Sequence, residues 1–263
     1  MELGLQGKVA IITGGSAGIG KATAKRLCEE GVRVTICARR PEVLRQAAEE
    51  IEAQTGGEVL AVPADVCRDE QVAQMVQQTL DRFGGVDILV NNAGGSRAFS
   101  FFEATEALWR EDLEIKLFGA IRCIRAVVPS MRQRGGGRII NITTIGGKAP
   151  RPHALPTTVS RAAGINLTKS LASEFAADNI LVNTICLGLV KSAQWERRYE
   201  ALRQQQPDLT LEAYYAQVGQ RVPLGRMGEP EEVADLIAFL VSPRAAFITG
   251  TAINFDGGAA AVV

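Results

Sequence analysis

Short apolar runs rich in Val and Ile alternate along this chain with longer segments whose apolar residues recur at helical spacing. Lys8–Gly14 is the first run, and its unbroken apolar character predicts a strand buried on both faces. Further strands are predicted at Val32–Cys37, Glu58–Pro63, Asp87–Asn91, Arg138–Thr143, Ile180–Ile185 and Ala252–Phe255. Helices are predicted at Lys21–Glu30, Pro41–Gln54, Asp69–Phe83, Leu108–Arg134, Val159–Ala177 and Pro230–Leu240. This alternation predicts an α/β fold, a doubly wound parallel sheet with helices on both faces.

The 263 residues fit one domain spanning 1–263, because α/β folds of this length commonly form a single unit. One polar, glutamine-rich segment, Ser192–Gln220, interrupts the alternation and holds all three tyrosines. It is either a solvated helical pair or a mobile lid over a substrate. Its aromatic content favours the lid.

Composition excludes several classes of function. The 29 basic and 29 acidic residues cancel, which argues against broad binding of nucleic acid or an anionic membrane. The five cysteines are scattered without metal-ligand spacing, and the one histidine has no partner at such spacing, so we expect reduced thiols, a cytoplasmic location and no metal site. No apolar run reaches the ~18 residues of a membrane span, and the first eight residues lack the apolar core of a signal peptide.

A glycine-rich loop lies where the first strand passes into the first helix. It reads Thr13-Gly14-Gly15-Ser16-Ala17-Gly18-Ile19-Gly20. Gly14 permits a sharp turn, Gly18 leaves room for a pyrophosphate, and Gly20 lets the helix pack closely on the strand. The helix N-terminus then offers free N–H groups to the phosphates. The loop predicts a Rossmann-type dinucleotide site.

The residues after the second strand indicate which dinucleotide binds. An NAD site places a carboxylate here to accept hydrogen bonds from the ribose 2′-hydroxyl, but no carboxylate occurs before Glu42. Arg39 and Arg40 offer guanidinium groups that match a 2′-phosphate in charge and geometry. They could instead begin a solvated helix, but next to the glycine loop they favour NADP(H).

Several segments together resemble the short-chain dehydrogenase/reductase family from about Gly7 to Gly258. The loop is similar to its TGxxxGxG motif, Asp65-Val66 to its adenine-side pair, and Asn91–Gly94 to its NNAG motif. Ile180–Asn183, Pro223–Ala234 and Thr249–Gly258 are similar to its later segments. The resemblance implies cofactor contacts from Gly14, Ser16, Ala17, Gly18, Ile19, Gly20, Arg39, Arg40, Asp65, Val66, Asn92, Ala93, Gly94, Arg161, Val190 and Ser192.

The chain departs from the catalytic residues of that family, which are an asparagine, a serine, a tyrosine and a lysine. The tyrosine position falls on Thr157 and the lysine position on Arg161, with the spacing of four preserved. Thr144 takes the place of the serine and Lys116 that of the asparagine. Thr144 keeps a hydroxyl and Arg161 keeps a charge, but an aliphatic alcohol at Thr157 is far less acidic than a phenol and cannot readily deliver a proton.

Another group must therefore supply the proton if the protein is an enzyme. Lys116 is one candidate, because burial and the like charge of Arg161 would draw its pKa toward neutrality. His153 is a second, since histidine titrates in the useful range, although an ordinary loop residue is the favoured interpretation. A tyrosine of Ser192–Gln220 is a third.

These observations lead to two hypotheses of function. The leading one is an NADPH-dependent oxidoreductase that reduces a small-molecule carbonyl or activated double bond through a non-standard proton relay. The alternative is a dinucleotide-binding regulatory or structural subunit without redox activity. The resemblance also implies a homotetramer built on Leu108–Arg134, Val159–Ala177 and the C-terminal strand.

Overall fold

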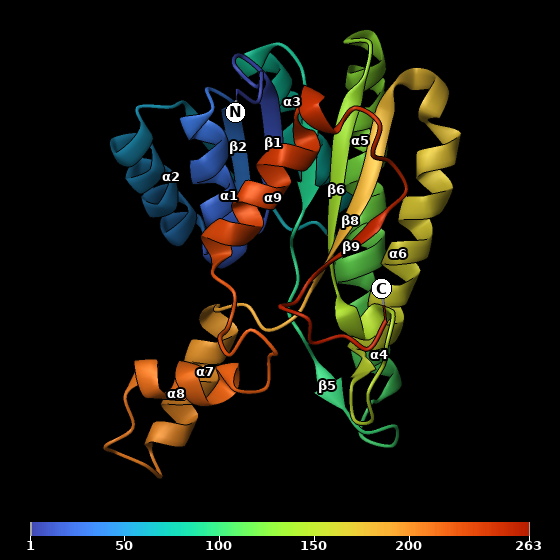
Figure 1. The fold of residues 1–263 in the computed structure, drawn as a ribbon. Coiled ribbons are helices and arrows are strands. Elements are labelled where there is room, and N and C mark those ends of the chain that lie inside the picture. The colour runs from blue at the N-terminus through green and yellow to red at the C-terminus, as the bar shows by residue number, and fades with distance from the viewer. Residues whose placement is uncertain (1, 263) are drawn as a thin grey trace.

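A seven-stranded parallel sheet forms the centre of the computed structural model, which describes residues 2–262 (Figure 1). Its strands are β1 (Val9–Thr13), β2 (Arg33–Ala38), β3 (Val59–Pro63), β4 (Ile88–Asn91), β6 (Gly137–Thr144), β8 (Ile180–Leu187) and β9 (Ala252–Phe255). They lie in the order β3-β2-β1-β4-β6-β8-β9, and every pairing is parallel. The chain thus runs outward from β1 in one direction and from β4 in the other.

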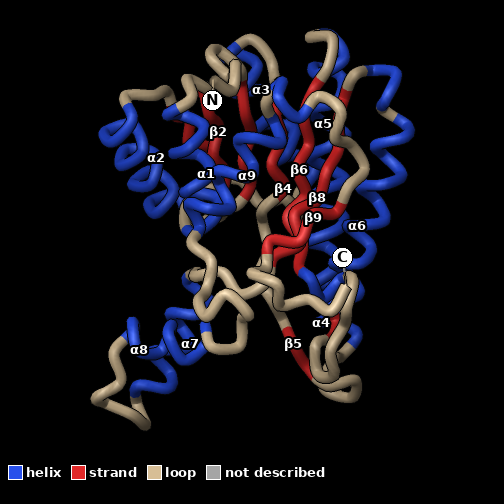
Figure 2. The backbone as a smooth tube through the Cα atoms, in the orientation of Figure 1, coloured by secondary structure: helices blue, strands red, loops and turns tan. Residues whose placement is uncertain are grey.

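Helices cover both faces of this sheet (Figure 2). On one face lie α1 (Gly18–Glu29), α2 (Pro41–Thr55) and α9 (Pro230–Val241), and on the other lie α3 (Asp69–Phe83), α5 (Gly119–Gln133) and α6 (Thr157–Glu174). Successive residues of β4 alternate between the two cores, with Ile88 and Val90 in one and Leu89 in the other. Burial on both sides explains the unbroken apolar runs. The predicted doubly wound Rossmann fold is confirmed.

The structure corrects the predicted Leu108–Arg134 helix. It begins earlier, as α4 (Glu106–Leu113), and a π-helical turn at Glu114–Phe118 separates α4 from α5. A π turn widens the helix without interrupting it, so apolar spacing gave no sign of it. The turn carries Lys116.

Other boundaries moved by a few residues, and one small element was missed. α1 begins at Gly18 rather than Lys21, because glycines carry no apolar periodicity. α6 runs from Thr157 to Glu174 rather than from Val159 to Ala177. An unpredicted two-stranded antiparallel ribbon joins β5 (Ala98–Phe99) to β7 (Leu155–Pro156).

Two helices, α7 (Ala193–Arg203) and α8 (Leu211–Gly219), stand apart from the sheet (orange in Figure 1). They share a separate small apolar cluster that includes Tyr199, Tyr214, Val218 and Met227. The predicted interruption at Ser192–Gln220 is therefore a helical pair with a core of its own.

Within residues 2–262, no helix is long and apolar enough to cross a bilayer. The same residues contain no group of three or more His, Cys, Asp or Glu side chains placed to hold a metal ion.

We expect limited trypsin digestion to cut first after Arg203, the exposed last residue of α7. A helix pair held by a small satellite cluster opens at lower free energy than the sheet core. Intact-mass spectrometry of the first fragments measures this, and Arg203→Gln should remove that cut. A first cut inside the sheet, for example after Arg138, would contradict the expectation.

Candidate active site

A cleft of about 670 Å³ opens at the carboxyl ends of the strands, where β1 and β4 lie side by side and the chain runs outward in opposite directions. Open α/β sheets bind their ligands at such a switch point. At one end the cleft is lined by Gly14, Ser16, Arg39, Arg40, Asp65 and Val66. At the other it is lined by Gly94, Arg97, Asp112, Lys116, Gln194 and Arg197.

The glycine loop fits a pyrophosphate. The first turn of α1 carries no acidic residue, and its N-cap, Ala17, offers no side-chain cap, so the N–H groups there are left for a ligand. A Cβ on Gly18 would meet no atom within 4 Å, which leaves open space above the helix start. A Cβ on Gly20 would lie 2.3 Å from the carbonyl oxygen of Gly14, so only glycine lets the helix pack this closely.

Asn92 holds this loop in place from the neighbouring strand. Its Nδ2 donates to the carbonyl oxygens of Thr13 (3.0 Å) and Gly14 (3.2 Å), and the N–H of Ala93 donates to Thr13 Oγ1 (3.0 Å). The NNAG segment therefore links the ends of β1 and β4 and shapes the cleft floor.

The adenine end of the cleft carries free positive charge. Arg39 and Arg40 directly follow β2, are exposed, and form no ion pair with residues 2–262. The Asp65 carboxylate is turned to the backbone, where its Oδ1 accepts the N–H of Cys67 (3.0 Å). Two unpaired guanidinium groups at this position suit an additional phosphate on the ribose.

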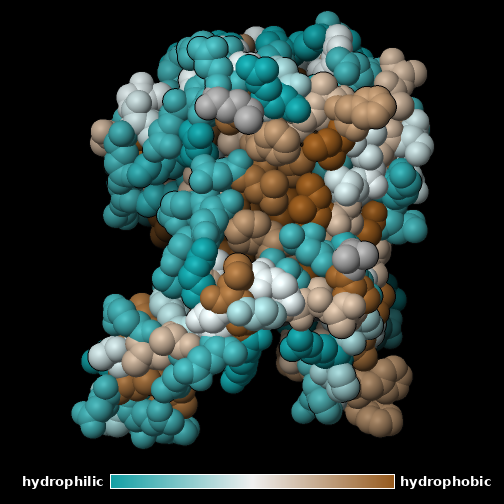
Figure 3. Space-filling model, viewed as in Figure 1, coloured by the Kyte–Doolittle hydropathy of each residue, from teal (hydrophilic) through white to brown (hydrophobic). Residues whose placement is uncertain are grey.

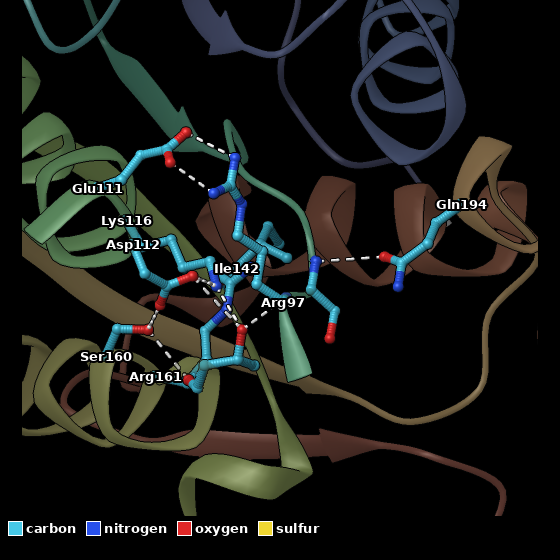
Figure 4. Close-up of polar contacts among 10 residues, drawn as sticks. Arg97, Glu111, Asp112, Lys116, Ile142, Ser160, Arg161 and Gln194 are labelled. Carbon is cyan, nitrogen blue, oxygen red and sulfur yellow. Dashed lines mark hydrogen bonds and ion pairs between the residues drawn. The ribbon is translucent and has the colours of Figure 1, made fainter. Parts of the chain in front are cut away.

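The other end of the cleft holds a buried polar cluster around Lys116 (Figure 4). The Lys116 ammonium donates to Asp112 Oδ1 and to Thr157 Oγ1, the latter at 2.6 Å. The backbone N–H of Arg97 also donates to Thr157 Oγ1, at 2.9 Å. The Lys116 and Asp112 side chains are only 3% and 1% exposed, so this ion pair is withdrawn from solvent.

Burial lowers the pKa of Lys116 from its usual value to about 8. The nearby Arg161 charge lowers it further and Arg97 contributes in the same direction, whereas hydrogen bonding and attraction to Asp112 raise it. An amine with a pKa near 8 is largely charged at neutral pH and can still give up its proton. That is the behaviour required of a general acid.

Arg161 keeps the charge expected at the lysine position. Its Nη1 donates to the Ile142 carbonyl oxygen at 2.6 Å, and its guanidinium lies beside Gly94. Burial lowers its pKa to about 10. Its Nε is buried and has no hydrogen-bond partner among the described residues.

Other predicted site residues lie outside this cluster. Thr144 ends β6 half-buried and does not line the cleft. His153 is exposed in the loop before β7 and does not line the cleft. Val190 is buried and pairs with Gly228, and Ser192 precedes α7. No tyrosine of Ser192–Gln220 is among the residues that line the cleft.

Two residues of the cluster were not anticipated from the sequence. Asp112 accepts hydrogen bonds from both Lys116 and Ser160, whose Oγ lies 2.6 Å from Oδ2. A carboxylate four residues before a lysine on one helix is a recognisable signal, and it could have indicated the pair. Nothing in the sequence could place Ser160, which comes from α6.

Three comparisons identify what kind of protein has this fold and cleft. The family model described as enoyl-(acyl carrier protein) reductase matches residues 14–260. A 3-oxoacyl-[acyl-carrier-protein] reductase of Synechocystis sp. is 35% identical over 97% of both chains. L-sorbose reductase of Gluconobacter frateurii, solved with NADPH and L-sorbose, is 36% identical, covers 100% of both chains and superposes with a TM-score of 0.96.

A further similar structure is the NADPH-bound short-chain oxidoreductase of Pseudomonas aeruginosa PAO1, described as containing an atypical catalytic center. It is 38% identical, covers 97% of this chain and 98% of its own, and has a TM-score of 0.90. The match to the family model spans nearly the whole chain, and the relatives agree with it in sequence and in fold. The protein belongs to the short-chain dehydrogenase/reductase family.

Proposed function

We propose that the protein is an NADPH-dependent reductase of a small-molecule carbonyl, with Lys116 as the proton donor in place of a tyrosine. The observation that carries this proposal is the buried Lys116 ammonium on the cleft wall, hydrogen-bonded to Thr157 Oγ1 at 2.6 Å. Its pKa of about 8 supports the same role. The similarity to a ketoacyl-type reductase and to a sorbose reductase favours a ketone over a double bond.

The cofactor supplies the hydride. The glycine loop and the start of α1 hold its pyrophosphate, and Arg39 and Arg40 hold the 2′-phosphate. Lys116 would donate its proton to the carbonyl oxygen of the substrate, so the product would be an alcohol. The lysine is left neutral and regains its proton from water. Arg161 and Lys116 together stabilise the developing negative charge on oxygen.

Ser192–Gln220 is proposed to be the lid of this cleft. Gln194 Oε1 accepts the backbone N–H of Ser96 at 3.2 Å (Figure 4). This hydrogen bond joins the start of α7 to the loop that carries Arg97. Gln194 and Arg197 both line the cleft, so movement of α7 changes its shape. We therefore assign substrate selection to this segment.

NADPH should bind at least tenfold more tightly than NADH, a difference of about 1.4 kcal/mol. The reason is the pairing of Arg39 with the 2′-phosphate. Fluorescence titration of both cofactors measures it, and Arg39→Ala should weaken NADPH binding while leaving NADH binding nearly unchanged. Equal affinities in the parent protein, or a preference that survives the substitution, would exclude this role for Arg39.

Lys116→Met should lower turnover of a verified ketone substrate by roughly 10²–10⁴-fold, the usual contribution of general acid catalysis. NADPH affinity should remain, because the cofactor contacts lie on other segments. In the parent protein, carbonyl reduction should fall as pH rises through about 8, since the ammonium form of Lys116 is lost there. Steady-state kinetics against pH measure both effects.

His153→Gln is the matched control, because it removes the other candidate acid and keeps polarity. We expect it to leave turnover within a few-fold, since His153 is exposed outside the cluster. If Lys116→Met changes turnover as little as His153→Gln, Lys116 is not the acid. If no ketone drives NADPH oxidation, the non-redox dinucleotide-binding subunit becomes the better hypothesis.

The protein is further proposed to assemble as a homotetramer. Phe118 and Val159 are exposed on the helices of one face. Over α9 and β9, Figure 3 shows a second gathering of apolar side chains, to which Leu236, Phe239, Ile248, Ile253 and Phe255 contribute. Apolar surface of this extent favours a subunit interface.

Sedimentation velocity at micromolar concentration should therefore give a tetramer. A charged substitution in the second patch, Ile253→Glu, should shift the distribution toward smaller species by placing a charge in the interface. A parent protein that sediments as a clean monomer would rule out the assembly.

A further inference from the structure

We propose that Asp112, held by Ser160, is a positioning residue that keeps Lys116 charged and directed at the substrate end of the cleft. This inference rests on the proposed role of Lys116 as the acid. It assigns function to two residues that lie outside the family motifs in the sequence.

The geometry of the carboxylate points to this role. Asp112 Oδ1 accepts from the Lys116 ammonium, and Thr157 Oγ1 lies 3.5 Å from the same oxygen. Oδ2 accepts from Ser160 Oγ at 2.6 Å, and the same hydroxyl lies 3.0 Å from the Thr157 carbonyl oxygen. Both oxygens are thus engaged, and the carboxylate is held between α4 and α6 (Figure 4).

The Thr157 hydroxyl completes the arrangement. It accepts from Lys116 Nζ and from the Arg97 N–H, and its own proton points to Asp112. A hydroxyl with both acceptor positions filled and its proton engaged is fixed in orientation. Lys116 is therefore held at two points, by Asp112 and by Thr157, and keeps its remaining N–H for a ligand in the cleft.

The charges around Lys116 make Asp112 necessary. Burial favours the neutral amine, and the facing cations, Arg161 on α6 and Arg97 on the loop after β4, favour it too. Glu111 is engaged by the Arg97 guanidinium on the exposed side of the helix. Asp112 is the buried carboxylate that opposes these effects. Without it the pKa of Lys116 would lie further below its usual value.

Asp112→Asn tests the proposal with almost no change in shape. With ¹³C-labelled lysine, the Cε signal of Lys116, assigned by its loss in Lys116→Met, is titrated by NMR in the parent and the variant. We expect the midpoint to fall from about 8 by one unit or more, as removal of an adjacent opposite charge does. With a verified ketone substrate, the alkaline limb of the pH–rate profile should shift to lower pH by the same amount.

Glu106→Gln is the matched control. It also converts a carboxylate of α4 to an amide, but Glu106 is exposed and pairs with Arg110. The titration midpoint of Lys116 in this variant should equal the midpoint in the parent protein. An unchanged midpoint in folded Asp112→Asn, or an equal shift in Glu106→Gln, would overturn the proposal.

If Asp112→Asn does not fold, the proposal can be tested on the parent protein instead. With ¹³C-labelled aspartate, the Asp112 carboxylate signal should move with the Lys116 midpoint, because the two groups share a hydrogen bond. An Asp112 signal that does not respond there would refute the coupling. None of these titrations needs turnover, so they stand apart from the Lys116→Met kinetics that test the proposed function.

Discussion

Parallel strands buried on both faces leave only their ends available for binding and chemistry. In this protein the sides of β1 and β4 are packed against helices, so their carboxyl ends form the floor of the cleft. The glycine loop follows β1, Asn92–Gly94 follow β4, and Asn92 links the two by hydrogen bonds. The position of every group in the cleft depends on this junction.

The buried polar cluster around Lys116 lies at the other end of the cleft and depends on the packing of side chains. Lys116, Asp112, Thr157 and Ser160 come from two helical regions packed against each other, and all four side chains are largely shielded from water. Low solvent access strengthens each charge effect and makes the lysine proton labile. The family tyrosine derives its acidity from a phenol, whereas in the proposed mechanism an amine whose pKa is lowered by burial would donate the proton.

The dinucleotide end of the cleft and the proposed proton donor are built from different elements of the fold. The cofactor end depends on backbone geometry at the strand ends, with free helix N–H groups and unpaired Arg39 and Arg40. The end that holds Lys116 depends on side chains of α4, the π turn and α6. The departures from the family pattern at Lys116, Thr157 and Arg161 all fall at this second end.

The amino-acid sequence by itself determined the doubly wound sheet, the dinucleotide loop and the candidate acid, because each leaves a local signal: a two-sided apolar run, glycines at fixed spacing, a lysine at a recognisable position. Only the tertiary structure decided that His153 lies away from the cluster and that Asp112 and Ser160 complete it. The π turn at Glu114–Phe118 likewise left no signal in the sequence. The physical reason is that, apart from the local Asp112–Lys116 pair, the contacts of Asp112 are made where α4 packs against α6, with residues more than forty positions away. Their distance and burial are set by how the helices pack on the sheet, which no local pattern encodes.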